Sequence, residues 1–136
     1  PEVAPFEAVR TPLGQAGHIS VGQFAAKHWD IRLPNQIFAW SSCVGSGYYL
    51  LKGLLLAYVL RSRLWDLAGV MPLVKAAGFE ARFPDGAPFD FRIASGGQFA
   101  LDAAGPHRWR LNDDLIIAPD REAIDYIRNH VTLIQA

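Results

Sequence analysis

Two short, uninterrupted apolar runs constrain the fold of this chain more than any other feature. Residues 54–60 read LLLAYVL and residues 115–118 read LIIA, without a charged side chain in either run. Such runs are typical of strands that are covered on both faces in a parallel or mixed sheet. A helix continuing through residues 54–60 is the alternative interpretation, because periodicity does not separate the two in so short a run.

Helix signals lie between these runs. Residues 48–53 predict a short helix, preceded by a loop of small residues at 41–47. Asp66 opens a largely apolar helix over residues 67–78, which we expect to be buried on most sides. Pro72 would cost about 3 kcal/mol in a regular helix interior, so we expect a kink or an irregular first turn there.

The remaining elements complete an alternating pattern. Asp120 is a good N-cap for a final helix from Arg121 onwards, with a core stripe formed by Ile124, Ile127 and Val131. Further strands are predicted at residues 18–24, 37–40 and 79–83. This alternation predicts an α/β fold, a layered mixed sheet flanked by helices. Prolines and glycines in residues 1–17 predict an irregular N-terminal segment before a single α/β domain over residues 18–136.

Charge and cysteine content argue against several classes of function. Thirteen basic residues balance thirteen acidic ones, so no basic field favours nucleic acid. The longest apolar stretch, residues 48–60, contains Lys52 and is shorter than the roughly 20 residues of a membrane-spanning helix. Cys43 is the only cysteine, which excludes an intramolecular disulfide and fits a cytoplasmic protein. The chain begins with Pro1 and not Met, so we expect a fragment of a longer product.

Asp66 has two roles open to it from its position alone. An aspartate at the start of a helix is most often an N-cap. It can also be a carboxylate ligand for a hard cation such as Mg²⁺ at a strand-to-helix junction, although one carboxylate does not make such a site. Asp113 and Asp114 could bind a cation as well, but a solvated loop before a strand is the stronger interpretation of that pair.

The segment around Asp66 resembles the C-terminal signature of the inositol monophosphatase and fructose-1,6-bisphosphatase-like superfamily. The matching residues, in order, are Trp65-Asp66, Ala68-Gly69, Leu73-Val74 and Ala77-Gly78. In that family the aspartate after the tryptophan binds a catalytic metal ion, so the resemblance implies that Asp66 is a Mg²⁺ ligand. Phe79 stands where the family usually has another glycine.

A second stretch supports the resemblance. Gly45, Ser46 and Gly47 precede a predicted helix at the spacing of the family's small-residue element, which faces the substrate. Small residues at a helix N-terminus expose N–H groups that can hold an anion or a hydroxyl. The resemblance therefore implies that these three residues bind substrate. A simple loop-to-helix turn is the structural alternative.

The family's Asp-Pro-Ile/Leu-Asp-Gly-Thr loop and the metal-binding glutamate are absent from this sequence. Both belong to the N-terminal half of such enzymes. A glutamate that contacts inositol in some members would fall near Val59, which makes inositol monophosphate a doubtful substrate.

The resemblance implies a hydrolase, the substrate-side half of a Mg²⁺-dependent phosphomonoesterase acting on an inositol, sugar or nucleotide phosphate. Its partners would be that substrate and the missing N-terminal half. We expect the isolated chain to be inert, because it holds only one of several metal carboxylates. The alternative is a non-catalytic interaction module that binds a partner or a second copy of itself. A short gene product, a separately expressed part of a longer gene and a proteolytic remnant all fit the sequence.

Overall fold

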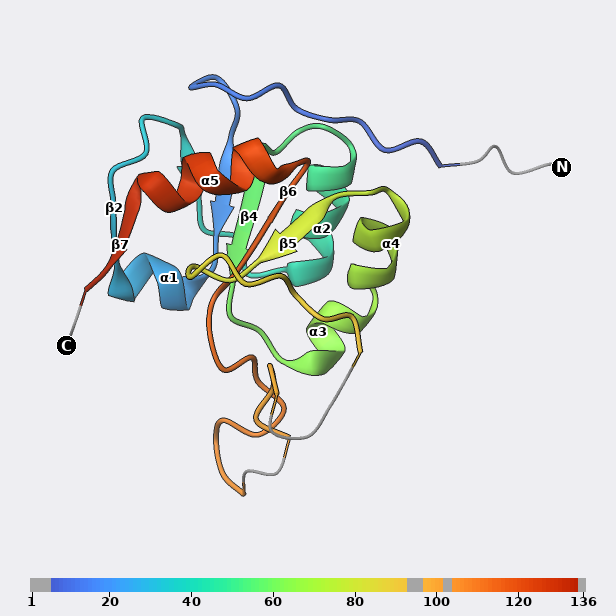
Figure 1. Ribbon diagram of the computed structural model, residues 1–136, viewed down its shortest axis with the longest axis vertical. Helices are drawn as coiled ribbons and strands as arrows, with labels where there is room; N and C mark the ends of the chain where they lie inside the picture. Colours follow the sequence, from blue (N-terminus) through green and yellow to red (C-terminus); the bar gives the residue numbers. More distant parts are fainter. Residues whose placement is uncertain (1–5, 93–96, 102–103, 135–136) are drawn as a thin grey trace, which may run out of the picture.

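The computed structural model describes residues 6–92, 97–101 and 104–134, and its centre is a five-stranded mixed sheet in the order β3-β1-β4-β6-β5 (Figure 1). The strands are β1 (Ile19–Val21), β3 (Ile37–Phe38), β4 (Ala57–Leu60), β5 (Glu80–Arg82) and β6 (Leu115–Ala118). Strand β1 pairs in parallel with both β3 and β4, and β6 runs antiparallel to β4 and β5. Strands β1, β3, β4 and β5 therefore run in the same direction. A separate antiparallel pair joins β2 (Trp29–Ile31) to β7 (Val131–Leu133).

The two apolar runs form the centre of the sheet, which confirms the α/β fold. Every residue of β4 and β6 is buried. The helical alternative for residues 54–60 is wrong. The strand β4 occupies only Ala57–Leu60 and is therefore shorter than the apolar run. Leu54 is exposed in the turn that follows Gly53, whose φ of 71° suits glycine at a helix end.

Helices cover both faces of the sheet, as Figure 1 shows with α5 in front and α2 behind. Helices α1 (Gln23–His28) and α5 (Arg121–Asn129) pack on one face. The other face is covered by α2 (Cys43–Leu51), α3 (Leu64–Ala68) and α4 (Met71–Ala76). Side chains alternate along β4, so Tyr58 and Leu60 pack toward α2 while Val59 packs toward α5.

The predicted loop at residues 41–47 is wrong, because α2 begins at Cys43. Ser42 is its N-cap, and its hydroxyl accepts a hydrogen bond from the Gly45 N–H at 3.0 Å. Tertiary packing outweighs the low helix propensity of the glycines. A Cβ on Gly47 would lie 2.4 Å from Cγ1 of Val70, so only glycine allows this close approach.

The single helix predicted for residues 67–78 is two short helices. Asp66 is the third residue of α3 and not its N-cap. Pro72 is the second residue of α4, where its missing N–H removes no helical hydrogen bond. Leu73 is 52% exposed, so burial on most sides is wrong for this segment.

Both ends of the domain differ in detail from the predicted elements. The strand expected at residues 18–24 ends at Val21. Val131, expected on the final helix, lies in β7. Strands β2 and β7 were not predicted, because three-residue strands carry almost no periodic signal.

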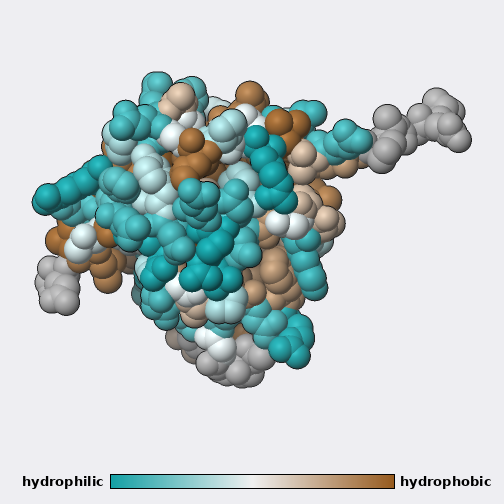
Figure 2. Space-filling view, turned by 45° about the horizontal axis from the view of Figure 1, so that its top comes forward, coloured by the Kyte–Doolittle hydropathy of each residue, from teal (hydrophilic) through white to brown (hydrophobic). Residues whose placement is uncertain are grey.

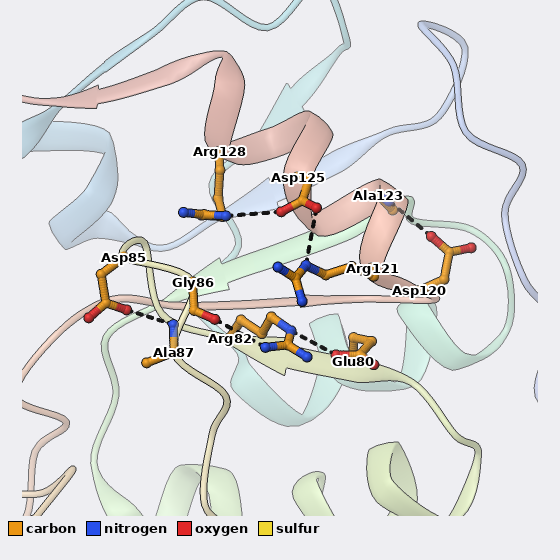
Figure 3. Close-up of polar contacts among 10 residues, drawn as sticks. All are labelled: Glu80, Arg82, Asp85, Gly86, Ala87, Asp120, Arg121, Ala123, Asp125 and Arg128. Atoms are coloured by element: carbon orange, nitrogen blue, oxygen red, sulfur yellow. Dashed lines mark hydrogen bonds and ion pairs between the residues drawn. The ribbon is translucent and has the colours of Figure 1, made fainter.

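The start of the final helix is confirmed. Asp120 is the N-cap of α5, and its Oδ1 accepts a hydrogen bond from the Ala123 N–H at 2.9 Å (Figure 3). Figure 3 also shows Asp125 between Arg121 and Arg128, and Arg82 beside Glu80. These ion pairs lie on the exposed side of α5 and β5, where each contributes little to stability. They leave this face charged.

Residues 6–18 contain no helix or strand, and Val9 bridges to Lys52 at the end of α2. The first five residues of the expected irregular segment lie outside the described residues. Within the described residues, no helix is long and apolar enough to cross a bilayer.

Candidate functional site

A crevice of about 500 Å³ opens at the carboxyl ends of β1, β3 and β4. It is lined by residues 22–24 after β1, by Trp40, Ser41 and Cys43 after β3, and by residues 60–62 at the end of β4. The chain leaves β1 into α1 on one face of the sheet, whereas it leaves β3 and β4 into α2 and α3 on the other. Ligands of open α/β sheets bind where neighbouring strands diverge in this way.

Asp66 lies on the wall of this crevice. Helix α3 follows β4 after three residues, and the half-buried Asp66 side chain projects from its first turn. Asp66 Oδ2 is 3.4 Å from the Arg63 backbone nitrogen, at the long end of hydrogen-bond geometry. The capping contact is therefore weak, and the carboxylate still faces the crevice.

The described residues do not form a complete magnesium site. They contain no group of three histidine, cysteine, aspartate or glutamate side chains placed to hold a metal ion. Mg²⁺ prefers oxygen ligands and near-octahedral geometry. Asp66 can supply one such ligand.

Gly45, Ser46 and Gly47 do not line the crevice. Ser46 is fully buried, and its Oγ lies 3.1 Å from Oγ of Ser20. Gly47 packs against Val70, as described above. The part of α2 that does reach the crevice is its first turn, through Cys43.

Tyr58 connects this buried serine to the crevice. Its side chain lies beside Ser46 and Cys43, and the tyrosine lines the crevice. Burial raises the pKa of Tyr58 far above its ordinary value, and the contact with Cys43 raises it further. Tyr58 is therefore a neutral phenol at any physiological pH.

Positively charged side chains surround the crevice, a feature that the sequence did not lead us to expect. Lys27 comes from α1, Arg61 from the end of β4, and Arg110 from the loop before β6. The Arg61 guanidinium is held from several sides. Its Nη2 donates to Asp113 Oδ1 at 2.9 Å and to Asp114 Oδ2 at 3.0 Å, and its Cζ lies 3.8 Å from the centre of the Phe24 ring.

Asp114 is not in a solvated loop, which corrects the interpretation of the Asp113-Asp114 pair. Its side chain is completely buried, and Oδ2 also accepts a hydrogen bond from Trp29 Nε1 at 3.0 Å. Burial raises the pKa of Asp114, while the Arg61 charge opposes that rise. The antiparallel register of Leu60 opposite Leu115 places Arg61 next to Asp114. A sequence signal did exist, since opposite charges flank the two apolar runs at ends that antiparallel pairing brings together.

No protein-family model matches the chain, and no curated protein matches it with significant sequence similarity. Solved structures do match it in three dimensions. An inositol monophosphatase II from Staphylococcus aureus superposes with a TM-score of 0.63 at 12% identity, covering 93% of this chain and 45% of that one. An inositol monophosphatase/NADP phosphatase with Mg²⁺ and phosphate gives 0.61 at 13% identity, covering 91% and 42%.

This chain has the fold of one part of an inositol monophosphatase. The resemblance noted around Trp65-Asp66 is confirmed at the level of fold by these superpositions. The chain spans less than half the length of the inositol monophosphatase structures that it matches. Their reactions and ligands are therefore proposals for this chain.

Proposed function

We propose that this chain is the substrate-side half of a Mg²⁺-dependent phosphomonoesterase, with Asp66 as one metal ligand. The observation that carries the proposal is the place of Asp66, on the wall of a crevice at the carboxyl ends of three parallel strands. The shared fold supports it, because the matched structures include one with Mg²⁺ and phosphate and one complexed with products.

The surroundings of Asp66 also suit a phosphate ester. Lys27, Arg61 and Arg110 supply positive charge. The first turn of α2 adds the partial positive charge of a helix N-terminus. Tyr58 supplies a neutral hydroxyl that stays protonated. These groups can bind an anionic ester and orient it toward Asp66 without any rearrangement of the sheet.

Gly45, Ser46 and Gly47 keep a proposed role on the substrate side. We assign that role to their effect on α2, because Gly47 allows the helix to approach Val70 and Ser46 joins it to Ser20. These contacts fix the position of the helix N-terminus. Substitutions here would therefore act on substrate binding through the placement of Cys43 and its neighbours.

The substrate that we favour is a sugar or nucleotide phosphate. Val59 is buried on the α5 side of the sheet and does not line the crevice, so it offers no acceptor for inositol hydroxyls. One matched structure contains D-inositol-1-phosphate and another contains 2′-AMP, so both compounds belong in a substrate panel. The single cysteine agrees with a cytoplasmic location.

The test is a phosphatase assay on the full-length gene product, with Asp66→Asn as the variant. Removal of a metal carboxylate should lower kcat/KM by about 100-fold or more, since bound metal ions supply several kcal/mol of transition-state stabilisation. Asp30→Asn is the matched control, because Asp30 pairs with Arg32 on the exposed surface. Unchanged activity in Asp66→Asn would remove the assigned role. We expect no Mg²⁺-dependent turnover from the isolated 136 residues.

A second candidate function is a non-catalytic interaction module. The observation behind it is an uncharged strip on α2, α3 and α4, made of Val44, Tyr48, Trp65 and Leu73, each of which is more than half exposed. Figure 2 shows hydrophobic side chains in several places on this face, one of them on the side of the molecule where Figure 1 places α2 and α4. Exposed apolar surface of this kind is common at interfaces with other proteins. A monomeric isolated chain would count against self-association through this strip.

A further inference from the structure

A cavity separate from the crevice lies behind α3. It has a volume of about 400 Å³ and is bounded by α3, by α4 and by the segments that carry residues 89–91 and Phe99. Among the described residues, it shares no lining residue with the crevice. A helix turns by about 100° per residue, so Leu64 and Ala68 lie on the face of α3 opposite Asp66. Helix α3 therefore stands between the two sites.

The interior of this cavity, which we call the α3–α4 cavity, is apolar. All of its described lining residues except Lys75 and Asp90 have apolar side chains. Leu67 and Met71 line it although they are only 2% and 5% exposed, so the cavity reaches into the core. A mostly apolar lining and a volume of this size are typical of sites for small molecules.

The aromatic wall of the α3–α4 cavity is held in place by its own contacts. The Phe89 ring centre lies 5.2 Å from that of Phe91 and 6.2 Å from that of Phe99, both in edge-to-face geometry. Two hydrogen bonds join the segments on which these rings lie. The Asp90 N–H donates to Gln98 Oε1, and Gln98 Nε2 donates to Asp90 O, each at 2.6 Å. A preformed wall lowers the entropic cost of binding a ligand.

Two charged side chains line the α3–α4 cavity, and they differ in their surroundings. Asp90 Oδ1 accepts hydrogen bonds from the Arg92 N–H at 2.9 Å and from Arg92 Nε at 3.2 Å. The exposed Lys75 comes from the last turn of α4, and its Nζ lies 5.3 Å from the centre of the Phe91 ring. Within residues 6–92, 97–101 and 104–134, no ion pair includes Lys75. The cavity thus combines an apolar interior with an exposed cation that no described carboxylate pairs with.

We infer that the α3–α4 cavity binds a small aryl or alkyl carboxylate, with its apolar body among the phenylalanines and its carboxylate at Lys75. Removing the apolar body from water supplies most of the affinity. The charge-assisted contact with the ammonium decides which end of the ligand faces solvent. A cationic ligand would be repelled by Lys75 and would meet an Asp90 that is already paired with Arg92. The site requires neither the crevice nor a metal ion, so this proposal and the phosphatase proposal can fail separately.

The test follows the amide chemical shifts of the isotope-labelled 136-residue chain during titration with phenylbutyrate. We expect saturable shifts in residues 64–75 and 89–91, which locate the site and give the affinity. Phenylbutyramide has the same apolar body without the charge, and it should bind about fivefold more weakly, the size expected for one exposed ion pair. Acetate has the charge without the apolar body, and it should leave these residues unshifted at the same concentration.

The charge variant is Lys75→Gln, which should weaken phenylbutyrate binding about fivefold and leave phenylbutyramide binding unchanged. Lys52→Gln is the matched control. Lys52 also lies over an aromatic ring, that of Phe6 at 5.6 Å, but it lines neither the α3–α4 cavity nor the crevice. Lys27→Gln removes a charge from the crevice and controls for carboxylate binding there. Thermal melts establish that the three variants are folded.

Three results would overturn the inference. The first is the absence of saturable shifts in residues 64–75 and 89–91, including the case in which only crevice residues shift. The second is equal affinity of the wild type for phenylbutyrate and phenylbutyramide. The third is a loss of phenylbutyrate affinity in Lys52→Gln or Lys27→Gln as large as that in Lys75→Gln.

Discussion

Two adjacent aspartates show how strongly the environment of a residue decides its role. Asp113 and Asp114 both contact Nη2 of Arg61, yet the Asp113 side chain is 51% exposed while that of Asp114 is completely buried. An exposed ion pair is worth little, whereas removing one partner of a buried pair leaves an uncompensated charge. Asp114 also satisfies the indole N–H of Trp29. The buried aspartate therefore holds Arg61 in place, and its neighbour adds little.

Asp114→Ala should reduce the free energy of unfolding by about 3 kcal/mol, because it leaves Arg61 and Trp29 without their buried acceptor. Asp113→Ala should cost less than about 1 kcal/mol. Urea denaturation at neutral pH measures both. Similar losses in the two variants would mean that burial does not distinguish these carboxylates.

Helices and strands were predicted well where a single sequence pattern, such as an apolar run or an N-cap residue, indicated the element. The runs at residues 54–60 and 115–118 were predicted as buried strands, with a helix left open for the first run, and Asp120 was predicted to cap a helix. Prediction failed at α2, because Gly45, Ser46 and Gly47 have low helix propensity and the close packing of Gly47 against Val70 is not visible in the sequence. The positive charge around the crevice was not predicted for a related reason. Lys27, Arg61 and Arg110 are far apart in sequence and come together only through the strand order.

The close approach of α2 to the start of α4 gives a prediction at this scale. Gly47→Ala should destabilise the domain by about 2 kcal/mol, because its Cβ would lie 2.4 Å from Cγ1 of Val70. Gly69→Ala should stay within about 0.5 kcal/mol of the wild type, since a Cβ there meets nothing within 4 Å. Thermal unfolding measures both variants. The double variant Gly47→Ala, Val70→Ala should recover part of the loss, and no recovery would show that the contact is not the cause.

Exposed charged and apolar side chains are unevenly distributed over the described part of the molecule. Ion pairs cover the exposed side of α5 and β5, whereas the strip on α2, α3 and α4 has no charged member. The chain also covers less than half of the inositol monophosphatase structures that it matches. Under the alternative function, a partner or a second copy of the chain would cover the strip.

The isolated chain should therefore self-associate through this strip if it is an interaction module, because exposed apolar area drives association when no other partner is present. Light scattering over a range of concentrations measures the mass. Leu73→Gln should shift the chain toward the monomer, whereas Leu133→Gln on β7 should not, although the two leucines are 52% and 55% exposed. A monomer at every concentration would count against the interaction module and leave the phosphatase half as the remaining candidate. Equal effects of the two substitutions would show that association depends on general hydrophobicity and not on the surface of α2, α3 and α4.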